Sequence, residues 1–151
     1  MTAPRAVLVI DDDPEMGWVL ASALAGAGWG ATVVSSGAEA LAWVLAAVLA
    51  DAGWGATVVD GGGKPQAFLP KNAFPLAFLD ARLPDMNGME LARELRRVRP
   101  GMRIVMISGY FFADDVEVAD AIKESRIDGF LAKPFDLDAI SAMLVTVPAW
   151  E

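Results

Sequence analysis

The sequence predicts an α/β fold in which an open, doubly wound parallel sheet is covered by helices on both faces. Short apolar runs recur along the chain, and such runs are typical of strands that are buried on both sides. A segment with helical periodicity or helix-capping residues follows each run. Because strands and helices alternate strictly over 151 residues, we expect one domain whose ligands bind beyond the carboxyl ends of the strands.

Five runs rich in Val, Ile, Leu and Phe are predicted as the strands of this sheet. None of them shows the apolar and polar alternation of a strand with one solvated face. They are Val7–Ile10, Ala31–Val34, Leu76–Leu79, Ile104–Ile107 and Phe130–Ala132.

The first two helices are predicted from their start signals. Asp13 fits an N-cap, with Pro14 at the first helical position and Glu15 in the first turn. Ser36 to Glu39 forms a capping box, which is typical of a second helix start. The apolar residues expected on one face of this second helix are Leu41, Val44, Leu45, Val48 and Leu49.

The remaining helices follow the third, fourth and fifth strands. Leu91, Leu95 and Val98 recur at helical spacing, and Pro100 with Gly101 ends that helix. Two more helices are expected at Asp114–Ser125 and Asp136–Val145.

Composition excludes several classes of site. The chain has no cysteine and no histidine, which removes thiolate and imidazole metal ligands, Ser-His-Asp catalysis and a phosphohistidine on this chain. A net charge of −8 argues against direct nucleic-acid binding, and the tryptophans are expected to serve packing. Met16 to Ala38 is uncharged and long enough to span a bilayer, but its glycines and missing cationic flanks favour a buried helix plus strand. With no signal peptide, we expect a cytoplasmic protein without a membrane segment.

Polar residues gather where the predicted strands end. The carboxyl ends of parallel strands meet at one edge of a sheet, so these side chains should converge. Carboxylates without His or Cys favour a hard cation such as Mg²⁺, and a lysine with a hydroxyl would complete a cradle for a phosphoryl group. The residues concerned are Asp11, Asp12, Asp13, Asp80, Ser108 and Lys133.

Four segments, "VIDDDP", "LDARLPDMNG", "ISG" and "KPF", occur in this order at the predicted strand ends. With them the chain resembles, over nearly its whole length, the receiver domain of bacterial two-component response regulators. The resemblance implies a flavodoxin-like, chemotaxis-regulator-like fold with five parallel strands in the order 2-1-3-4-5.

The resemblance also implies the roles of the acidic residues. Asp80 would be the phospho-acceptor and would form an aspartyl phosphate. Mg²⁺ or Mn²⁺ would be held by Asp12 directly, by Asp11 through water, by Asp80 and by the main-chain carbonyl of Arg82. Asp13 is expected to cap the next helix, with metal ligation as its alternative, and the structural alternative for Asp11 and Asp12 is that they are solvated turn residues.

Further roles are implied for the later strand ends. Ser108 and Lys133 would contact phosphoryl oxygens, and Ser108 with Phe130 would form the conformational switch. The peptide bond between Lys133 and Pro134 would be cis. Alternatively, Lys133 is only a structural ion-pair partner of Asp80, and Phe130 is an ordinary residue of the hydrophobic core. The Arg82 side chain either is solvated or influences how long the phosphoryl group survives on Asp80.

The chain departs from the family pattern in a repeat. "AGWGATVV" occurs at Ala27–Val34 and again at Ala52–Val59, about 25 residues apart. The spacing from Asp11 to Asp80 exceeds the family's usual spacing by about the same length, so we expect one receiver domain over 1–151 with an insertion of about 25 residues within roughly 50–75.

The first copy is expected to form the second strand, because a well-capped helix follows it. The second copy could add an edge strand through a right-handed crossover. The glycines and prolines at 61–70 would then leave the return mostly irregular. Exchange of the two copies is the competing arrangement. A lengthened loop, "GYFFADD", with Phe111 and Phe112 could contact a partner or fold onto the core.

These features imply a receiver rather than a turnover enzyme. The donor must be another chain, a histidine kinase or a histidine phosphotransfer protein, because this one has no histidine. Phosphorylation would change the face formed by the fourth helix, fifth strand and fifth helix. This face would bind a downstream protein, an effector domain, or a second copy of the chain in a homodimer. One alternative is a pseudo-receiver that binds proteins without phosphorylation. Another is a phosphatase with Asp80 as its nucleophile. A phosphatase would need a general acid just beyond Asp80, and Arg82 cannot act as one.

Overall fold

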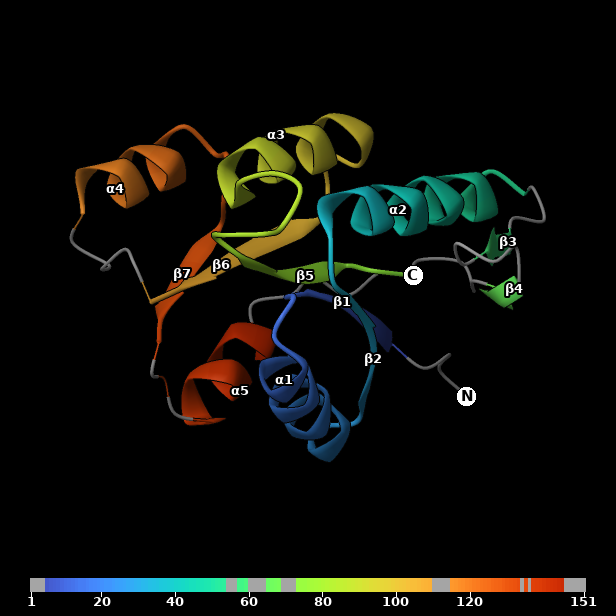
Figure 1. Cartoon of the computed structure of the whole chain (residues 1–151), viewed down its shortest axis with the longest axis horizontal. Helices are drawn as coiled ribbons and strands as arrows, with labels where there is room; N and C mark the ends of the chain where they lie inside the picture. The colour runs from blue at the N-terminus through green and yellow to red at the C-terminus, as the bar shows by residue number, and fades with distance from the viewer. Residues whose placement is uncertain are drawn as a thin grey trace.

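A five-stranded parallel sheet forms the centre of the molecule in this computed structural model (Figure 1). Its order, β2-β1-β5-β6-β7, is the predicted 2-1-3-4-5 arrangement. The strands are β1 (Arg5–Ile10), β2 (Trp29–Val34), β5 (Leu76–Asp80), β6 (Arg103–Ser108) and β7 (Gly129–Ala132). The structure describes residues 5–53, 57–59, 65–68, 73–109, 115–133, 135 and 137–145.

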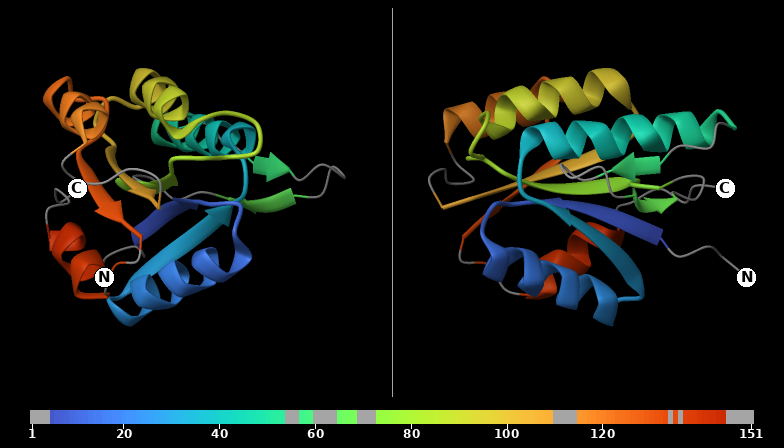
Figure 2. Two further views of the ribbon diagram at one scale, coloured as in Figure 1. Left: turned by 60° about the vertical axis from the view of Figure 1, so that its left-hand side comes forward. Right: turned by 45° about the vertical axis from the view of Figure 1, so that its right-hand side comes forward.

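Helices cover both faces of the sheet, as predicted (Figures 1 and 2). One face carries α1 (Pro14–Gly26) and α5 (Leu137–Val145). The other carries α2 (Gly37–Asp51), α3 (Gly88–Val98) and α4 (Val116–Lys123). The stretch from Met16 to Ala38 thus holds a helix and a strand, and no helix in the described ranges is long and apolar enough to cross a membrane.

The core has one part on each side of the sheet because successive side chains of a strand point to opposite faces. In β1, Leu8 and Ile10 pack toward α2 and α3, whereas Val7 and Val9 pack toward α1 and α5. All four side chains are fully buried. This burial is the physical reason for the uninterrupted apolar runs in the sequence.

The predicted helix caps are present. The Asp13 carboxylate accepts a hydrogen bond from Glu15 N at 3.0 Å, and Ser36 Oγ accepts one from Glu39 N at 3.2 Å. Asn87 caps α3 in the same way, accepting from Glu90 N at 2.8 Å. Local capping chemistry therefore sets where these helices begin.

Two expectations about apolar side chains are wrong. Leu45 and Leu49 do not join the buried face of α2, where they remain 49% and 48% exposed. Trp43 and the small Ala40 and Ala47 occupy that face instead, because α2 lies close to the sheet and to α3. Trp18 of α1 is 71% exposed and so does not serve packing.

The two copies of the octapeptide have different structures. The first ends in β2 and pairs with β1 over the whole strand, as predicted. The second contains β3 (Thr57–Val59), which pairs antiparallel with β4 (Pro65–Phe68) in a separate two-stranded sheet at the end of α2 (Figure 1). The expected edge strand is therefore wrong, and part of the return that was expected to be irregular is β4. A partner nearby in the chain costs little loop-closure entropy, which favours this hairpin.

Candidate functional site

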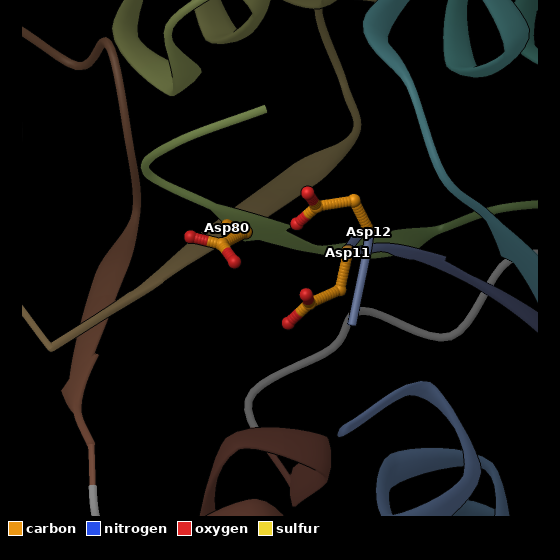
Figure 3. Close-up of side chains that lie close together, drawn as sticks. All are labelled: Asp11, Asp12 and Asp80. Carbon is orange, nitrogen blue, oxygen red and sulfur yellow. The ribbon is translucent and has the colours of Figure 1, made fainter. Parts of the chain in front are cut away.

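Three carboxylates meet at the carboxyl edge of the sheet (Figure 3). Asp11 and Asp12 directly follow β1, and Asp80 ends the neighbouring β5. One oxygen from each lies within 4.8 Å of the others. Asp11 and Asp80 are buried and Asp12 is exposed. The parallel register, which aligns Ile10 with Leu79, brings these residues together.

Lys133 supplies the opposing charge. It follows β7, and its Nζ lies 3.3 Å from Asp80 Oδ2 and 3.4 Å from Asp11 Oδ2. Its main-chain N–H donates to Ser108 O at 2.8 Å, which holds the residue against the end of β6. Burial opposes the ammonium charge, but the two carboxylates outweigh it and raise the pKa of Lys133.

Burial of Asp11 has a large electrostatic consequence. Loss of solvent raises the pKa of Asp11 to about 6, and the neighbouring Asp80 charge adds to the rise. The Asp13 N–H, which donates to Asp11 Oδ1 at 2.9 Å, and Lys133 both act in the opposite direction. Excess negative charge at this edge thus favours a bound cation or a proton.

The loop after Asp80 folds back on the residue. Arg82 N donates to Asp80 Oδ1 at 3.0 Å, and Gly88 N donates to Ala81 O at 2.8 Å. A Cβ on Gly88 would lie 2.7 Å from Asp80 O and 2.9 Å from Ala81 Cα. Only glycine allows α3 to begin this close to the end of β5.

Asp12 and Asp80 open into a pocket of about 540 Å³, which is also lined by Asp13, Arg82, Gly109 and Lys133. A water molecule takes up about 30 Å³ in the liquid, so a hydrated cation and a small anion both fit. The lining residues include carboxylates together with Lys133 and Arg82, which suits an anion bound next to a cation.

The structure thus brings Asp11, Asp12, Asp80 and Lys133 together as predicted. Asp13 lines the pocket, and its carboxylate caps α1 as predicted. Ser108 is fully buried, and Gly109, not Ser108, lines the pocket. Phe130 on β7 is partly buried against the core. Pro134, and with it the cis peptide, lies outside the described residues, as do Phe111 and Phe112.

Sequence reasoning missed Asp85. Its Oδ1 accepts from Gly37 N at 2.8 Å and its Oδ2 from Ala38 N at 2.9 Å, so it joins the loop after Asp80 to the start of α2. These hydrogen bonds lower the pKa of Asp85. The only sequence signal is a carboxylate in "LPDMNG", and its partners lie 48 and 47 residues away.

The donor set fits a hard divalent cation. Three carboxylates, each with an oxygen within 4.8 Å of the others, supply ligands of the kind that Mg²⁺ and Mn²⁺ prefer, and the exposed Asp12 leaves room for retained water. Asp11, Asp12 and Asp80 would hold such an ion.

Comparison with known proteins identifies a family. The model of the response regulator receiver domain matches residues 44–145, a region that includes Asp80, Ser108 and Lys133. The DNA-binding transcriptional regulator NtrC of Escherichia coli (strain K12) is 28% identical over 138 residues, which cover 91% of this chain and 24% of that protein. The chain therefore spans about a quarter of the length of this relative.

Solved structures share the fold. The chemotaxis protein CheY4 of Vibrio cholerae matches with a TM-score of 0.71 at 21% identity, covering 97% of this chain and 100% of that one. A response regulator protein from Burkholderia pseudomallei, with a phosphorylated aspartic acid, a calcium ion and citrate, matches with a TM-score of 0.67 at 24% identity, covering 94% and 67%. With the family match over residues 44–145, the chain belongs to the response regulator receiver domain family.

Proposed function

We propose that the chain is a phospho-accepting receiver and that Asp80 is its acceptor. The observation that carries this proposal is the convergence of three carboxylates and Lys133 Nζ, which lies 3.3 Å from Asp80 Oδ2, at one pocket. The phosphorylated aspartic acid and calcium ion in the Burkholderia pseudomallei protein are chemistry of the same kind on the same fold.

The transfer step uses groups of this chain and of a partner. An oxygen of the Asp80 carboxylate attacks the phosphorus of a phosphohistidine on a histidine kinase or a histidine phosphotransfer protein. The new O–P bond forms as the P–N bond breaks, and the histidine leaves with the bonding electron pair and takes up a proton from solvent. The result is an aspartyl phosphate on Asp80 and a free histidine on the partner.

The other site residues position and neutralise the transferred group. Lys133 would pair with one phosphoryl oxygen and the Ser108 hydroxyl would donate to another, which requires Ser108 to move out of its buried position. Asp11, Asp12, Asp80 and the Arg82 main-chain carbonyl would hold Mg²⁺ or Mn²⁺. When bound, this ion supplies positive charge that stabilises the phosphoryl oxygens in the transition state.

The output would be a change in the face formed by α4, β7 and α5. Movement of Ser108 toward the phosphoryl group would free space next to β7, and Phe130, which is partly buried there, would turn inward. The partner would be a downstream protein, a second copy of the chain, or an effector domain. A transcriptional output is one form this could take, since one of the longer relatives is a DNA-binding regulator.

The repeat fits the same proposal as an addition to one receiver domain spanning 1–151. The insertion of about 25 residues would lie within roughly 50–75, where β3 and β4 form their own small sheet. All five strands of the main sheet, and all residues of the proposed site, lie outside it.

The test is covalent labelling. Wild-type protein incubated with Mg²⁺ and acetyl phosphate should gain the mass of one phosphoryl group, and Asp80→Asn should gain none. Omission of Mg²⁺ should abolish the gain, and beryllofluoride should change the tryptophan fluorescence of the wild type only.

Absence of both labelling and beryllofluoride binding in the wild type would contradict this function and favour a pseudo-receiver. Hydrolysis of a small phosphate ester over many turnovers would favour a phosphatase instead.

A further inference from the structure

Asp85 holds the start of α2 from a distant loop. Its two carboxylate oxygens accept hydrogen bonds from the main-chain N–H groups of Gly37 and Ala38, at 2.8 and 2.9 Å. The side chain is exposed, and the two hydrogen bonds lower its pKa, so it is ionised at neutral pH. A negative charge at the start of a helix also interacts favourably with the helix dipole.

Each of the first four main-chain N–H groups of α2 donates a hydrogen bond, and the acceptors belong to two residues, Ser36 and Asp85. Ser36, the residue before the helix, accepts from Glu39 N through its Oγ and from Ala40 N through its carbonyl. Asp85 accepts from the two outermost groups. The helix therefore has its own cap, and Asp85 adds a link between α2 and the loop after Asp80.

Packing reinforces this link. The neighbouring Met86 lies against Gly37, where a Cβ would meet Met86 Sδ at 2.6 Å. Residues 82–87 are thus attached to α2 by two hydrogen bonds and one close apolar contact.

The other end of the loop is attached to the site. Arg82 N donates to Asp80 Oδ1 at 3.0 Å, and Leu83 N donates to Met86 O at 3.3 Å across the loop. The Gly88 N–H donates to Ala81 O, which joins the two ends of the loop. The conformation of Arg82, including its carbonyl, therefore depends on where Asp85 is held.

We propose that Asp85 is a positioning residue for the metal and phosphorylation site: by fixing the loop tip on α2, it orients the Arg82 main chain around Asp80. The inference rests on the proposed function and deepens it, because it concerns the same site. Preorganised outer residues of this kind contribute to metal affinity without touching the metal.

The test compares three variants of the full chain. Asp85→Ala removes both acceptors, Asp85→Asn keeps one acceptor oxygen, and Ser36→Ala removes the cap of the same helix that accepts from Glu39 N. Mn²⁺ affinity is measured from the free-ion signal in electron paramagnetic resonance, acetyl phosphate labelling by intact mass, and stability by urea unfolding.

We expect Asp85→Ala to weaken Mn²⁺ binding about tenfold and to slow labelling by a similar factor. Asp85→Asn should be intermediate, and Ser36→Ala should lose stability with an unchanged Mn²⁺ affinity. Intermediate behaviour of Asp85→Asn keeps the test informative if Asp85→Ala does not fold.

The opposite results separate the two proposals. A wild-type protein that takes no label would overturn the proposed function. A labelled wild type, with Asp85→Ala and Asp85→Asn binding Mn²⁺ as tightly as the wild type, would overturn only the role of Asp85. Equal weakening by Ser36→Ala would also overturn it, because the loss would then come from helix stability alone.

Discussion

Lys133 balances two buried carboxylates, and much of the behaviour of the site follows from this arrangement. Its Nζ lies within 3.4 Å of Oδ2 of both Asp11 and Asp80. Oxygens of these two carboxylates also lie within 4.8 Å of one another, and like charges so close together destabilise the folded protein unless a cation or a proton compensates them. The same lysine therefore stabilises the folded protein, and under the proposed function it would also pair with the transferred phosphoryl group.

Replacement of Lys133 by Met should destabilise the metal-free protein at pH 7.5. Loss of the ammonium leaves Asp11 and Asp80 without their counter-charge, and we expect the free energy of unfolding to fall by about 2 kcal/mol, less than for a fully buried pair. Urea unfolding in EDTA measures this loss, and millimolar Mg²⁺ should restore part of it. Lys123→Met, at an exposed lysine of α4, is the matched control, and an equal effect of both variants would contradict the prediction.

At the scale of elements, α2 and α3 are joined at both ends. Asp85, in the loop before α3, holds the start of α2. At the other end, Arg99 Nη2 after α3 lies 2.8 Å from Asp51 Oδ2 at the end of α2. The Arg99 side chain is buried, so its charge depends on such contacts. These two connections hold α2 between the site and the β3–β4 hairpin.

The junction between β5 and α3 should not tolerate a side chain at Gly88. In Gly88→Ala the new Cβ would press on main-chain atoms of Asp80 and Ala81, at 2.7 and 2.9 Å, and these cannot move without disturbing the strand end. We expect a loss of about 2 to 3 kcal/mol in urea unfolding, together with slower labelling of Asp80.

Gly26→Ala serves as the comparison for this variant. Gly26 ends α1, and a Cβ there would meet no atom within 4 Å. Alanine should leave stability unchanged or raise it by up to about 1 kcal/mol. A Gly88→Ala protein as stable as Gly26→Ala would contradict the prediction.

At the scale of the whole molecule, we expect the proposed metal site to couple the free energy of unfolding to pH and to the Mg²⁺ concentration. The pKa of Asp11 is about 6 in the folded protein and 3.8 in an unfolded chain. Between pH 3.8 and pH 6 the folded protein therefore keeps a proton that the unfolded chain releases. Stability contributed by this proton is fully present below the unfolded pKa and is lost as pH rises through about 6.

In EDTA, the free energy of unfolding should therefore decrease between pH 4 and pH 6.5 by at most about 3 kcal/mol on account of Asp11. Mg²⁺ should stabilise the protein increasingly above pH 6, where Asp11 is ionised and can hold it. The pKa of Asp85 is shifted the other way, so its contribution is lost only as pH falls below 3.8, outside this range.

Urea unfolding at several pH values, with and without Mg²⁺, measures both effects. Asp11→Asn has no titrating group at this position and should lack the decrease and most of the response to Mg²⁺. A wild type whose pH dependence matches that of Asp11→Asn would show that the buried carboxylate is not the source.

The duplicated octapeptide shows what local sequence cannot decide at this scale. The two copies have identical residues and therefore identical local propensities, yet one forms a full strand beside β1 and the other contributes to a separate hairpin. The capped helix after the first copy correctly indicated its place. The place of the second depended on β4, a partner that its own residues do not reveal.

Exposure was equally hard to predict for single residues. The apolar residues of α2 extend around the helix, so sequence did not reveal which of them face the sheet, and Leu45 and Leu49 were placed wrongly. Trp18 has large apolar area but lies on the outer side of α1. Only small side chains fit where a helix lies close to the sheet, and Ala40 and Ala47 of α2 are buried there.

The sequence by itself determined the alternation of strands and helices, the caps at Asp13 and Ser36, and the gathering of Asp11, Asp12, Asp80 and Lys133 at one edge. It could do so because periodicity and capping are local, and because parallel strands bring all their carboxyl ends to the same edge. Only the tertiary structure decided the hairpin of the second repeat and the attachment of Asp85 to α2, because both depend on partners that the fold supplies and the neighbouring residues do not.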